Sequence, residues 1–74
     1  MISKSQVVLY IYDELIDNKI LKTSDIVYKY NVSPRTVRRY ISEVNAYLYN
    51  NFKNLCVVYD HFNKWYCLKE INKI

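Results

Sequence analysis

Residues 25–41 constrain the fold more than any other stretch, because they read as two helices joined by a tight turn. Ser33 is a favourable N-cap, since its hydroxyl can accept hydrogen bonds from the free amides of a following helix. Pro34 then takes the first helical position, where its missing N–H costs nothing. Asn31 follows the upstream helix, and asparagine tolerates the left-handed conformation that a sharp turn requires. The stretch therefore predicts a helix, a turn and a second helix that begins at Pro34.

The second helix, expected over residues 34–49, has one apolar and one basic face. A single buried stripe is formed by Val37, Ile41, Val44 and Leu48. The helical period turns the opposite face towards solvent. That face carries Arg35, Arg39 and Ser42, with Thr36 and Arg38 on the flanks.

Positive charge is concentrated on this helix. All the arginines of the chain lie between positions 35 and 39, and no acidic residue lies between Lys29 and Ile41. The formal net charge of the chain is +4, so the patch adds to an overall positive balance. A concentrated basic patch on one helix favours a polyanionic partner. A solvated basic face without a partner is the alternative reading.

The same stretch resembles the helix-turn-helix of small bacterial winged-helix regulators, the DeoR-type and WYL-associated families. Their motif reads roughly I-A-E-K-F-G-V-S-R-R-T-V-R-R-D-I. The residues that agree in type are Ile26, Lys29, Val32, Ser33, Arg35, Thr36, Val37, Arg38, Arg39 and Ile41, with Tyr30 for the aromatic. The chain departs at Val27, Asn31 and Tyr40, where the families usually have a small residue, a glycine and an aspartate. The resemblance implies a winged helix-turn-helix that binds duplex DNA.

Local signals predict further elements upstream of the turn. Ser3 and Gln6 form a capping box, which predicts a first helix that runs to about Asp17. Residues 20–21 are a short apolar pair that could form a stub of strand. Residues 23–25, Thr-Ser-Asp, are expected to cap the helix that precedes the turn.

Two strand-like runs, residues 55–60 and 64–69, follow the helix expected over 34–49 and predict a β-hairpin. The intervening residues 60–63 contain no glycine, so a loop of about four residues is expected. Pairing Tyr59 with Lys64 sets Cys56 opposite Cys67. The hairpin resembles the wing of the WYL-associated domains, Y-D-x-x-x-x-G-Y-Y-L, with Trp65 where glycine is usual.

The expected fold class is α+β, a winged helix-turn-helix of three helices followed by a two-stranded β-hairpin wing. Its 74 residues have room for one domain, 1–74, with the helix-turn-helix over 24–49 and the wing over 55–69. A domain this small needs a dense core, and the 51% hydrophobic content with 16% aromatic residues supplies it. The sequence has no membrane-length apolar run and no signal peptide, so a cytoplasmic location and no membrane partner are expected.

Duplex contacts are expected from the first turns of the helix over 34–49, which enter the major groove in a helix-turn-helix. The expected DNA-binding residues are Ser33, Pro34, Arg35, Thr36, Arg38, Arg39 and Ser42, with His61 and Lys64 from the wing tip. Arg35 and Arg39 suit base reading, because arginine makes bidentate contacts to guanine. Arg38 lies further round the helix and suits a phosphate clamp. Capping alone would explain Ser33, and ordinary solvation would explain His61.

No chemistry beyond binding is indicated. The sequence has no paired carboxylate, nucleophile with a base, phosphate loop or metal cluster, so no enzyme, cofactor, metal or small-molecule ligand is expected. Cys56 and Cys67 are interpreted as small hydrophobes. A cross-strand redox switch is the less favoured alternative, and zinc would need four ligands.

Both faces of the predicted hairpin are apolar, although only one can pack on the helices. Val58, Trp65 and Cys67 lie on the second face and are expected to form a homodimer or partner interface. Alternatively, a C-terminal tail folded over Trp65 would cover this apolar face without a second copy or a partner. The favoured function is sequence-specific binding of duplex DNA by a small bacterial or phage transcriptional regulator that acts as a repressor. The alternative is a protein-interaction winged helix, such as a mobile-element or phage protein that inhibits a host complex.

Overall fold

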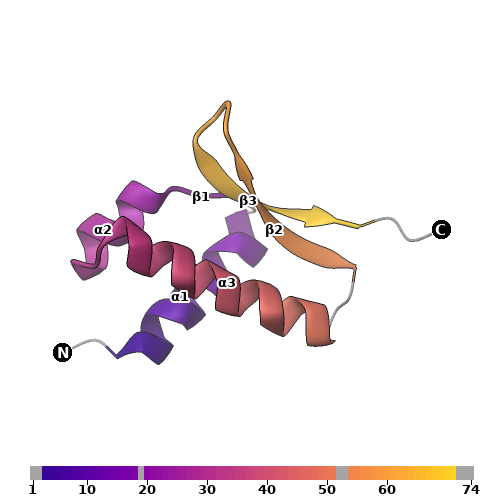
Figure 1. The fold of residues 1–74 in the computed structure, drawn as a ribbon, viewed down its shortest axis with the longest axis horizontal. Helices are drawn as coiled ribbons and strands as arrows, with labels where there is room; N and C mark the ends of the chain where they lie inside the picture. The colour runs from indigo at the N-terminus through magenta and orange to yellow at the C-terminus, as the bar shows by residue number, and fades with distance from the viewer. Residues whose placement is uncertain (1–2, 19, 52–53, 72–74) are drawn as a thin grey trace.

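The computed structural model describes residues 3–18, 20–51 and 54–71 and shows three helices and a three-stranded antiparallel sheet. The helices are α1 (Lys4–Asn18), α2 (Thr23–Tyr30) and α3 (Pro34–Asn51), and the strands are β1 (Ile20–Leu21), β2 (Leu55–Asp60) and β3 (Trp65–Glu70). In Figure 1 the helices pack together on one side and the twisted β2–β3 hairpin stands beside α3. The α+β class and the three helices are confirmed.

The predicted two-stranded wing is wrong in its strand number. The sheet has the order β1-β3-β2, because Ile20 pairs with Cys67 and Leu21 pairs with Tyr66. Leu21 is buried, so the short strand is tied to the core as well as to β3. A two-residue strand carries too little alternation for its partner to be identified from sequence.

The predicted register of the hairpin is also wrong. Asp60 pairs with Trp65 and Tyr59 with Tyr66, so Val58 lies opposite Cys67 and Cys56 lies opposite Lys69. Asp60 belongs to β2, and the four-residue loop is therefore 61–64 rather than 60–63. Because the partner of each residue moves by two positions, every side chain keeps its predicted face.

The core lies between the three helices and the inner face of the sheet. Its buried members are Val7, Ile11, Leu15, Leu21, Ile26, Val37, Ile41, Val44, Leu48 and Val57. All four residues of the predicted α3 stripe are among them, and this stripe holds α3 against both α1 and β2. Within the described residues, no helix is long and apolar enough to cross a membrane.

Candidate nucleic-acid interface

The turn between α2 and α3 has the predicted local geometry. Asn31 adopts the left-handed conformation, with φ 54° and ψ 48°. The Ser33 hydroxyl accepts a hydrogen bond from the Thr36 amide at 3.1 Å and donates one to the Thr36 hydroxyl at 3.0 Å. Ser33 therefore acts as the N-cap of α3, and the start of this helix at Pro34 is fixed by side-chain chemistry.

The cap of α2 differs from the prediction. This helix begins at Thr23, with Lys22 as an N-cap that makes no side-chain hydrogen bond. Residues 23–25 therefore lie inside the first turn rather than before it. The backbone of Lys22 closes the turn instead, because its carbonyl accepts from the Asp25 amide at 3.1 Å. Asp25 still places a negative charge in the first helical turn, as expected.

All three arginines of α3 are exposed. Among residues 3–18, 20–51 and 54–71, the ion pair is between Lys4 and Glu43, at 2.6 Å, and it involves no arginine. The first two turns of α3 thus present guanidinium groups that no acidic side chain of the described chain neutralises. Pro34 and Ser42 are exposed on the same helix, and Thr36 is half-buried.

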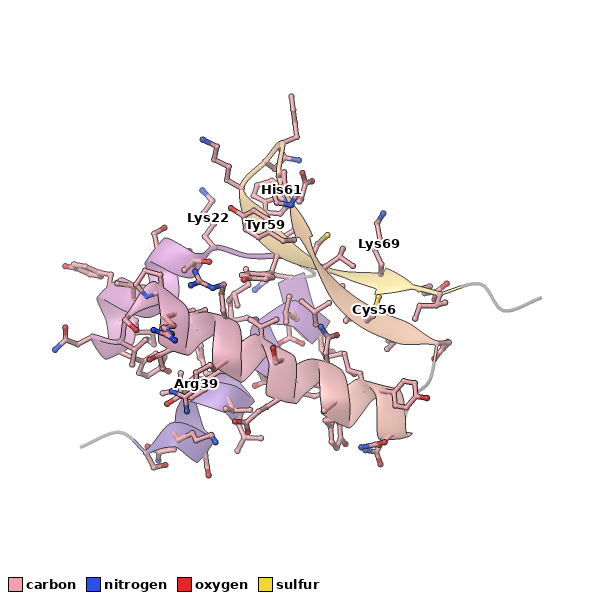
Figure 2. The ribbon with its side chains drawn as sticks, viewed as in Figure 1. Lys22, Arg39, Cys56, Tyr59, His61 and Lys69 are labelled. Atoms are coloured by element: carbon pink, nitrogen blue, oxygen red, sulfur yellow. The ribbon has the colours of Figure 1, made fainter. Side chains whose placement is uncertain are left out.

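The arginines point in different directions. Arg38 lines an open hollow between α3 and the hairpin, together with Tyr59 and Tyr66. Figure 2 shows Arg39 on the side of α3 away from Tyr59 and His61. At about 100° per residue, Arg35 falls between the other two arginines around the helix. The basic surface therefore spans an arc of α3 that begins beside the hairpin and continues towards its far side.

The hairpin tip is shaped by Asp60, a residue that the sequence reading did not single out. Its Oδ1 accepts from the Phe62 and Asn63 amides at 2.9 and 3.0 Å, and its Oδ2 accepts from Asn63 Nδ2 at 2.8 Å. The two bonds from Asn63 are the main cause that holds the pKa of Asp60 below its ordinary value. Desolvation opposes them, and the bond from Phe62 and the charge of Lys69 lower the pKa by smaller amounts. An aspartate before a short loop is itself a turn signal that could have identified it.

The predicted contact residues of the tip are both exposed. Lys64 closes the loop in a left-handed conformation with φ 63°, and its amide donates to the Asp60 carbonyl at 2.7 Å. The His61 ring packs edge-on against Tyr59 with the ring centroids 4.9 Å apart. Phe62 at the apex is 91% exposed. The tip is therefore a loop held by hydrogen bonds that carries an exposed lysine, Lys64, and an exposed aromatic ring, Phe62.

Asn45 fastens α3 to the hairpin and was also missed. It lies on the flank of the buried stripe, and its side chain makes two hydrogen bonds to the backbone of Val57. The sequence signal for such a tether is a polar residue next to a core position, and this signal does not identify the backbone group that the side chain will bond. The bonds fix the position of the hairpin relative to the arginine-bearing face.

The predicted interface residues come together on the outer face of the sheet. Ile20, Cys67 and Val58 form a row across the three strands, because Cys67 is the partner of both others. Val58, Trp65 and Cys67 are half-buried, and Cys56 and Cys67 are free thiols. Within the described residues no group of three or more metal-ligating side chains occurs.

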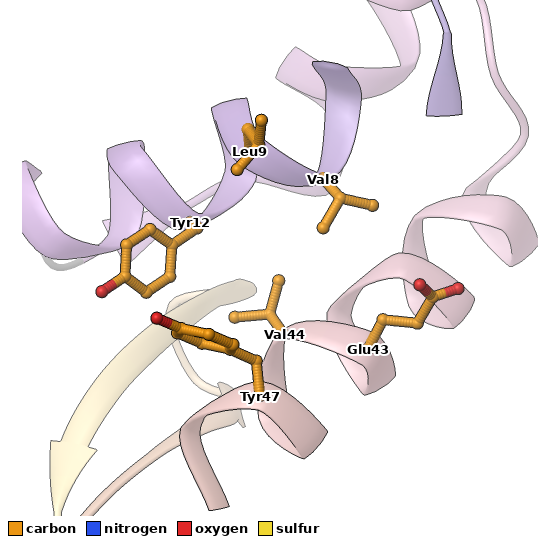
Figure 3. Close-up of a pocket in the computed structure, with 6 residues that line it drawn as sticks. All are labelled: Val8, Leu9, Tyr12, Glu43, Val44 and Tyr47. Atoms are coloured by element: carbon orange, nitrogen blue, oxygen red, sulfur yellow. The ribbon is translucent and has the colours of Figure 1, made fainter. Parts of the chain in front are cut away.

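A second apolar surface lies between α1 and α3. Figure 3 shows this groove, which holds about 370 Å³ and is lined by Val8, Leu9, Tyr12, Glu43, Val44 and Tyr47. Leu9, at the edge of the groove, is 65% exposed. The Tyr12 and Tyr47 rings pack edge-on with their centroids 5.7 Å apart. The groove is separate from the arginine cluster.

Comparisons of the chain with protein-family models, with curated protein sequences and with solved structures found no match.

Proposed function

We propose that this chain is a winged helix-turn-helix protein that binds duplex DNA, acting as a small transcriptional regulator of the repressor type. In this proposal α3 enters the major groove and the β2–β3 hairpin is the wing. The observation that carries the proposal is the cluster of three exposed arginines on the first turns of α3, none paired with an acidic side chain of the described chain.

A cluster of exposed guanidinium groups without acidic neighbours attracts a polyanion such as duplex DNA. Arg35 and Arg39, on the outer part of the arc, are the candidates for bidentate contacts to guanine. Arg38, beside the hairpin, is the candidate for a phosphate contact. The Ser33 hydroxyl is already engaged twice with Thr36, so its contribution is the start of α3 rather than a direct DNA contact.

Single alanine replacements of Arg35 and Arg39 test the proposal, with Lys69→Ala as a matched control for the loss of one positive charge. Figure 2 shows Lys69 on the sheet, far along the hairpin from its tip. Fluorescence anisotropy with duplexes selected from a random pool should show a loss of about 1–3 kcal/mol for each arginine variant at one base position. Selected duplexes bound equally well by both arginine variants and the control would contradict base reading.

We also propose that two copies pair through the outer sheet face, because one recognition helix covers only a half-site. The row Ile20–Cys67–Val58 carries no charge, so it is compatible with its own copy across a two-fold axis. The exposed face of α1 carries Asp13 and Asp17, and these like charges would repel each other in a symmetric α1 contact.

Sedimentation at micromolar concentration, combined with acrylamide quenching of Trp65, tests the pairing. Trp65 is the only tryptophan, so the fluorescence reports on this face alone. A dimer should form, and quenching should fall as the protein concentration rises. A monomer with concentration-independent quenching would exclude pairing through this face.

The second candidate function is protein contact, and the groove between α1 and α3 is the observation that favours it. An apolar, open groove between two helices suits an amphipathic helix of a partner protein, which would set apolar side chains beside Leu9 and Val44. This candidate predicts no duplex binding at physiological salt, whereas the DNA-binding proposal requires it.

A further inference from the structure

The hollow between α3 and the hairpin gathers polar side chains from three separate elements. It has a volume of about 510 Å³ and is lined by Thr23, Arg38, Tyr59, His61 and Tyr66. Thr23 comes from the first turn of α2, Arg38 from α3, and the three ring side chains from the hairpin. The outer flank of the predicted recognition surface and the inner side of the wing therefore share one concave site.

The polar groups of this hollow are available to a ligand. Within the described part of the chain, none of the five side chains has a hydrogen-bond partner, although each carries at least one donor. The Tyr59 and Tyr66 rings pack edge-on with their centroids 5.0 Å apart, and the Tyr59 ring also contacts the His61 ring. The ring contacts fix the hydroxyl of Tyr59 and the imidazole in place without using their hydrogen-bonding groups.

The local charge favours an anion. Arg38, which lines the hollow, is exposed, and no acidic side chain is among the five lining residues. The nearby acids are directed elsewhere: Asp25 lines a different hollow with Glu14 and Lys22, and Asp60 is held by the loop amides. Burial raises the pKa of Tyr66, although Arg38 opposes this, so Tyr66 is a neutral hydroxyl donor near neutral pH.

We infer that this hollow binds a phosphate group of the duplex backbone, next to the groove that α3 enters. The inference rests on the proposed function and assigns the site of one backbone contact within it. Phosphates border the major groove, so a hollow on the flank of an inserted helix lies where the backbone passes. The Arg38 guanidinium donates to one phosphate oxygen, and the hydroxyls of Thr23 and Tyr59 donate to another.

A free phosphate has the same chemistry as a backbone phosphate, so the experiment separates the two sources. The chain has three arginines, and their Nε–Hε signals in ¹⁵N NMR spectra are assigned by single replacements. The protein is titrated with a DNA duplex of about 20 base pairs, long enough for two half-sites one helical turn apart, and separately with inorganic phosphate. The expected result is a shift of the Arg38 signal with the duplex at concentrations far below those needed for inorganic phosphate.

Variants of the hollow give a second measurement. Tyr59→Phe removes the hydroxyl but keeps the ring contacts, and Tyr49→Phe removes an exposed hydroxyl near the end of α3 as the matched control. Arg38→Gln should weaken duplex binding about ten-fold, as the loss of a hydrogen bond to a charged group does, and reduce the salt slope by about one. Tyr59→Phe should weaken binding by a smaller factor, and Tyr49→Phe should leave it unchanged.

The outcomes separate the two proposals. If the duplex shifts the Arg35 and Arg39 signals but not that of Arg38, and Arg38→Gln binds normally, the phosphate site is wrong while DNA binding stands. If inorganic phosphate shifts Arg38 but the duplex does not, the hollow is not a backbone site. If the duplex shifts no arginine signal, the proposed function itself fails. Thermal melting of each variant excludes loss of fold as the cause of weaker binding.

Discussion

The Asn45 side chain hydrogen-bonds both main-chain groups of Val57. Its Nδ2 donates to the Val57 carbonyl at 3.0 Å, and its Oδ1 accepts from the Val57 amide at 2.6 Å. β2 is an edge strand of the sheet that the described residues form, so these two groups belong to the open edge of that sheet. The carboxamide takes the place of a neighbouring strand at this point and ties α3 to the hairpin.

Replacing Asn45 with alanine should destabilise the fold. The change leaves an amide and a carbonyl of a part-buried segment without their partner, which costs about 1–3 kcal/mol of unfolding free energy. Urea denaturation followed by circular dichroism measures this cost. Asn50→Ala, an exposed position on the same helix, is the control and should change stability by less than about 0.5 kcal/mol. Equal stability of the two variants would show that the Asn45 bonds contribute nothing.

The loop bonds of Asp60 predict a loss of stability in acid. Amide donors from Asn63 and Phe62 lower the pKa of this carboxyl in the folded state. A lowered folded-state pKa means that the charged group stabilises the fold above the unfolded pKa, near 4. That contribution is lost as the pH falls through the folded pKa, because protonation then weakens the loop bonds.

Carboxyl ¹³C NMR titration measures the Asp60 pKa directly. Comparison of the wild type with Asp60→Ala by urea denaturation at pH 7 and pH 3 gives the matching stability change. The difference between the two proteins should be larger at pH 7. A difference that grows towards pH 3 would show that the loop prefers the protonated carboxyl.

Lys64 predicts opposite effects on stability and on DNA binding. Its left-handed φ of 63° costs a residue with a Cβ about 1 kcal/mol, which Lys64→Gly removes. The same change deletes a cation of the hairpin tip, so duplex affinity should fall for all sequences alike and the salt slope should decrease by about one. Lys64→Asn serves as the control, since asparagine tolerates this conformation without a charge. Unchanged duplex binding in both variants would remove Lys64 from the interface.

In the hairpin, the strands and their faces were predictable from the sequence, whereas the register was not. Alternation of apolar residues predicted both strands and assigned each side chain to the correct face. It did not give the register, because shifting the partners by two residues preserves the alternation and only the loop distinguishes the two pairings. The bonds from Asp60 to the Phe62 and Asn63 amides select the observed loop. Such bonds are a property of three-dimensional geometry, although an aspartate at this position is a recognisable hint.

The candidate site was predictable in composition but not in arrangement. The caps at Ser33 and Asn31 and the apolar stripe of α3 are local, so sequence alone identified where the helix begins and which face carries the arginines. The grouping of Arg38 with Thr23 and Tyr59 depends on how the hairpin is placed against α3. That placement depends on Asn45 and on the pairing of β1 with β3, which are contacts between segments distant in the chain.

Redox insensitivity is expected for the two cysteines. Cys56 and Cys67 are not directly opposite each other, since their partners are Lys69 and Val58. Diagonal neighbours in a sheet are about 7–8 Å apart, beyond the usual Cα separation in a disulfide. A Cys56→Ala/Cys67→Ala variant should bind the duplex as the wild type does, with and without dithiothreitol. Binding that switches reversibly with reductant in the wild type alone would contradict this expectation.

If the arginines of α3 form a DNA-binding surface, removing all three must weaken duplex binding and its dependence on salt. The observed binding constant is measured with a mixed-sequence duplex over a series of salt concentrations, for the wild type, an Arg35→Ala/Arg38→Ala/Arg39→Ala variant and Lys69→Ala. For B-DNA the slope of log K against log[salt] is about −0.9 for each neutralised phosphate. The wild type should bind with a steep slope, the triple arginine variant should bind much more weakly with a shallower slope, and Lys69→Ala should change little. Equal duplex binding and an equal salt slope in the wild type and in the triple arginine variant would show that these arginines do not bind DNA.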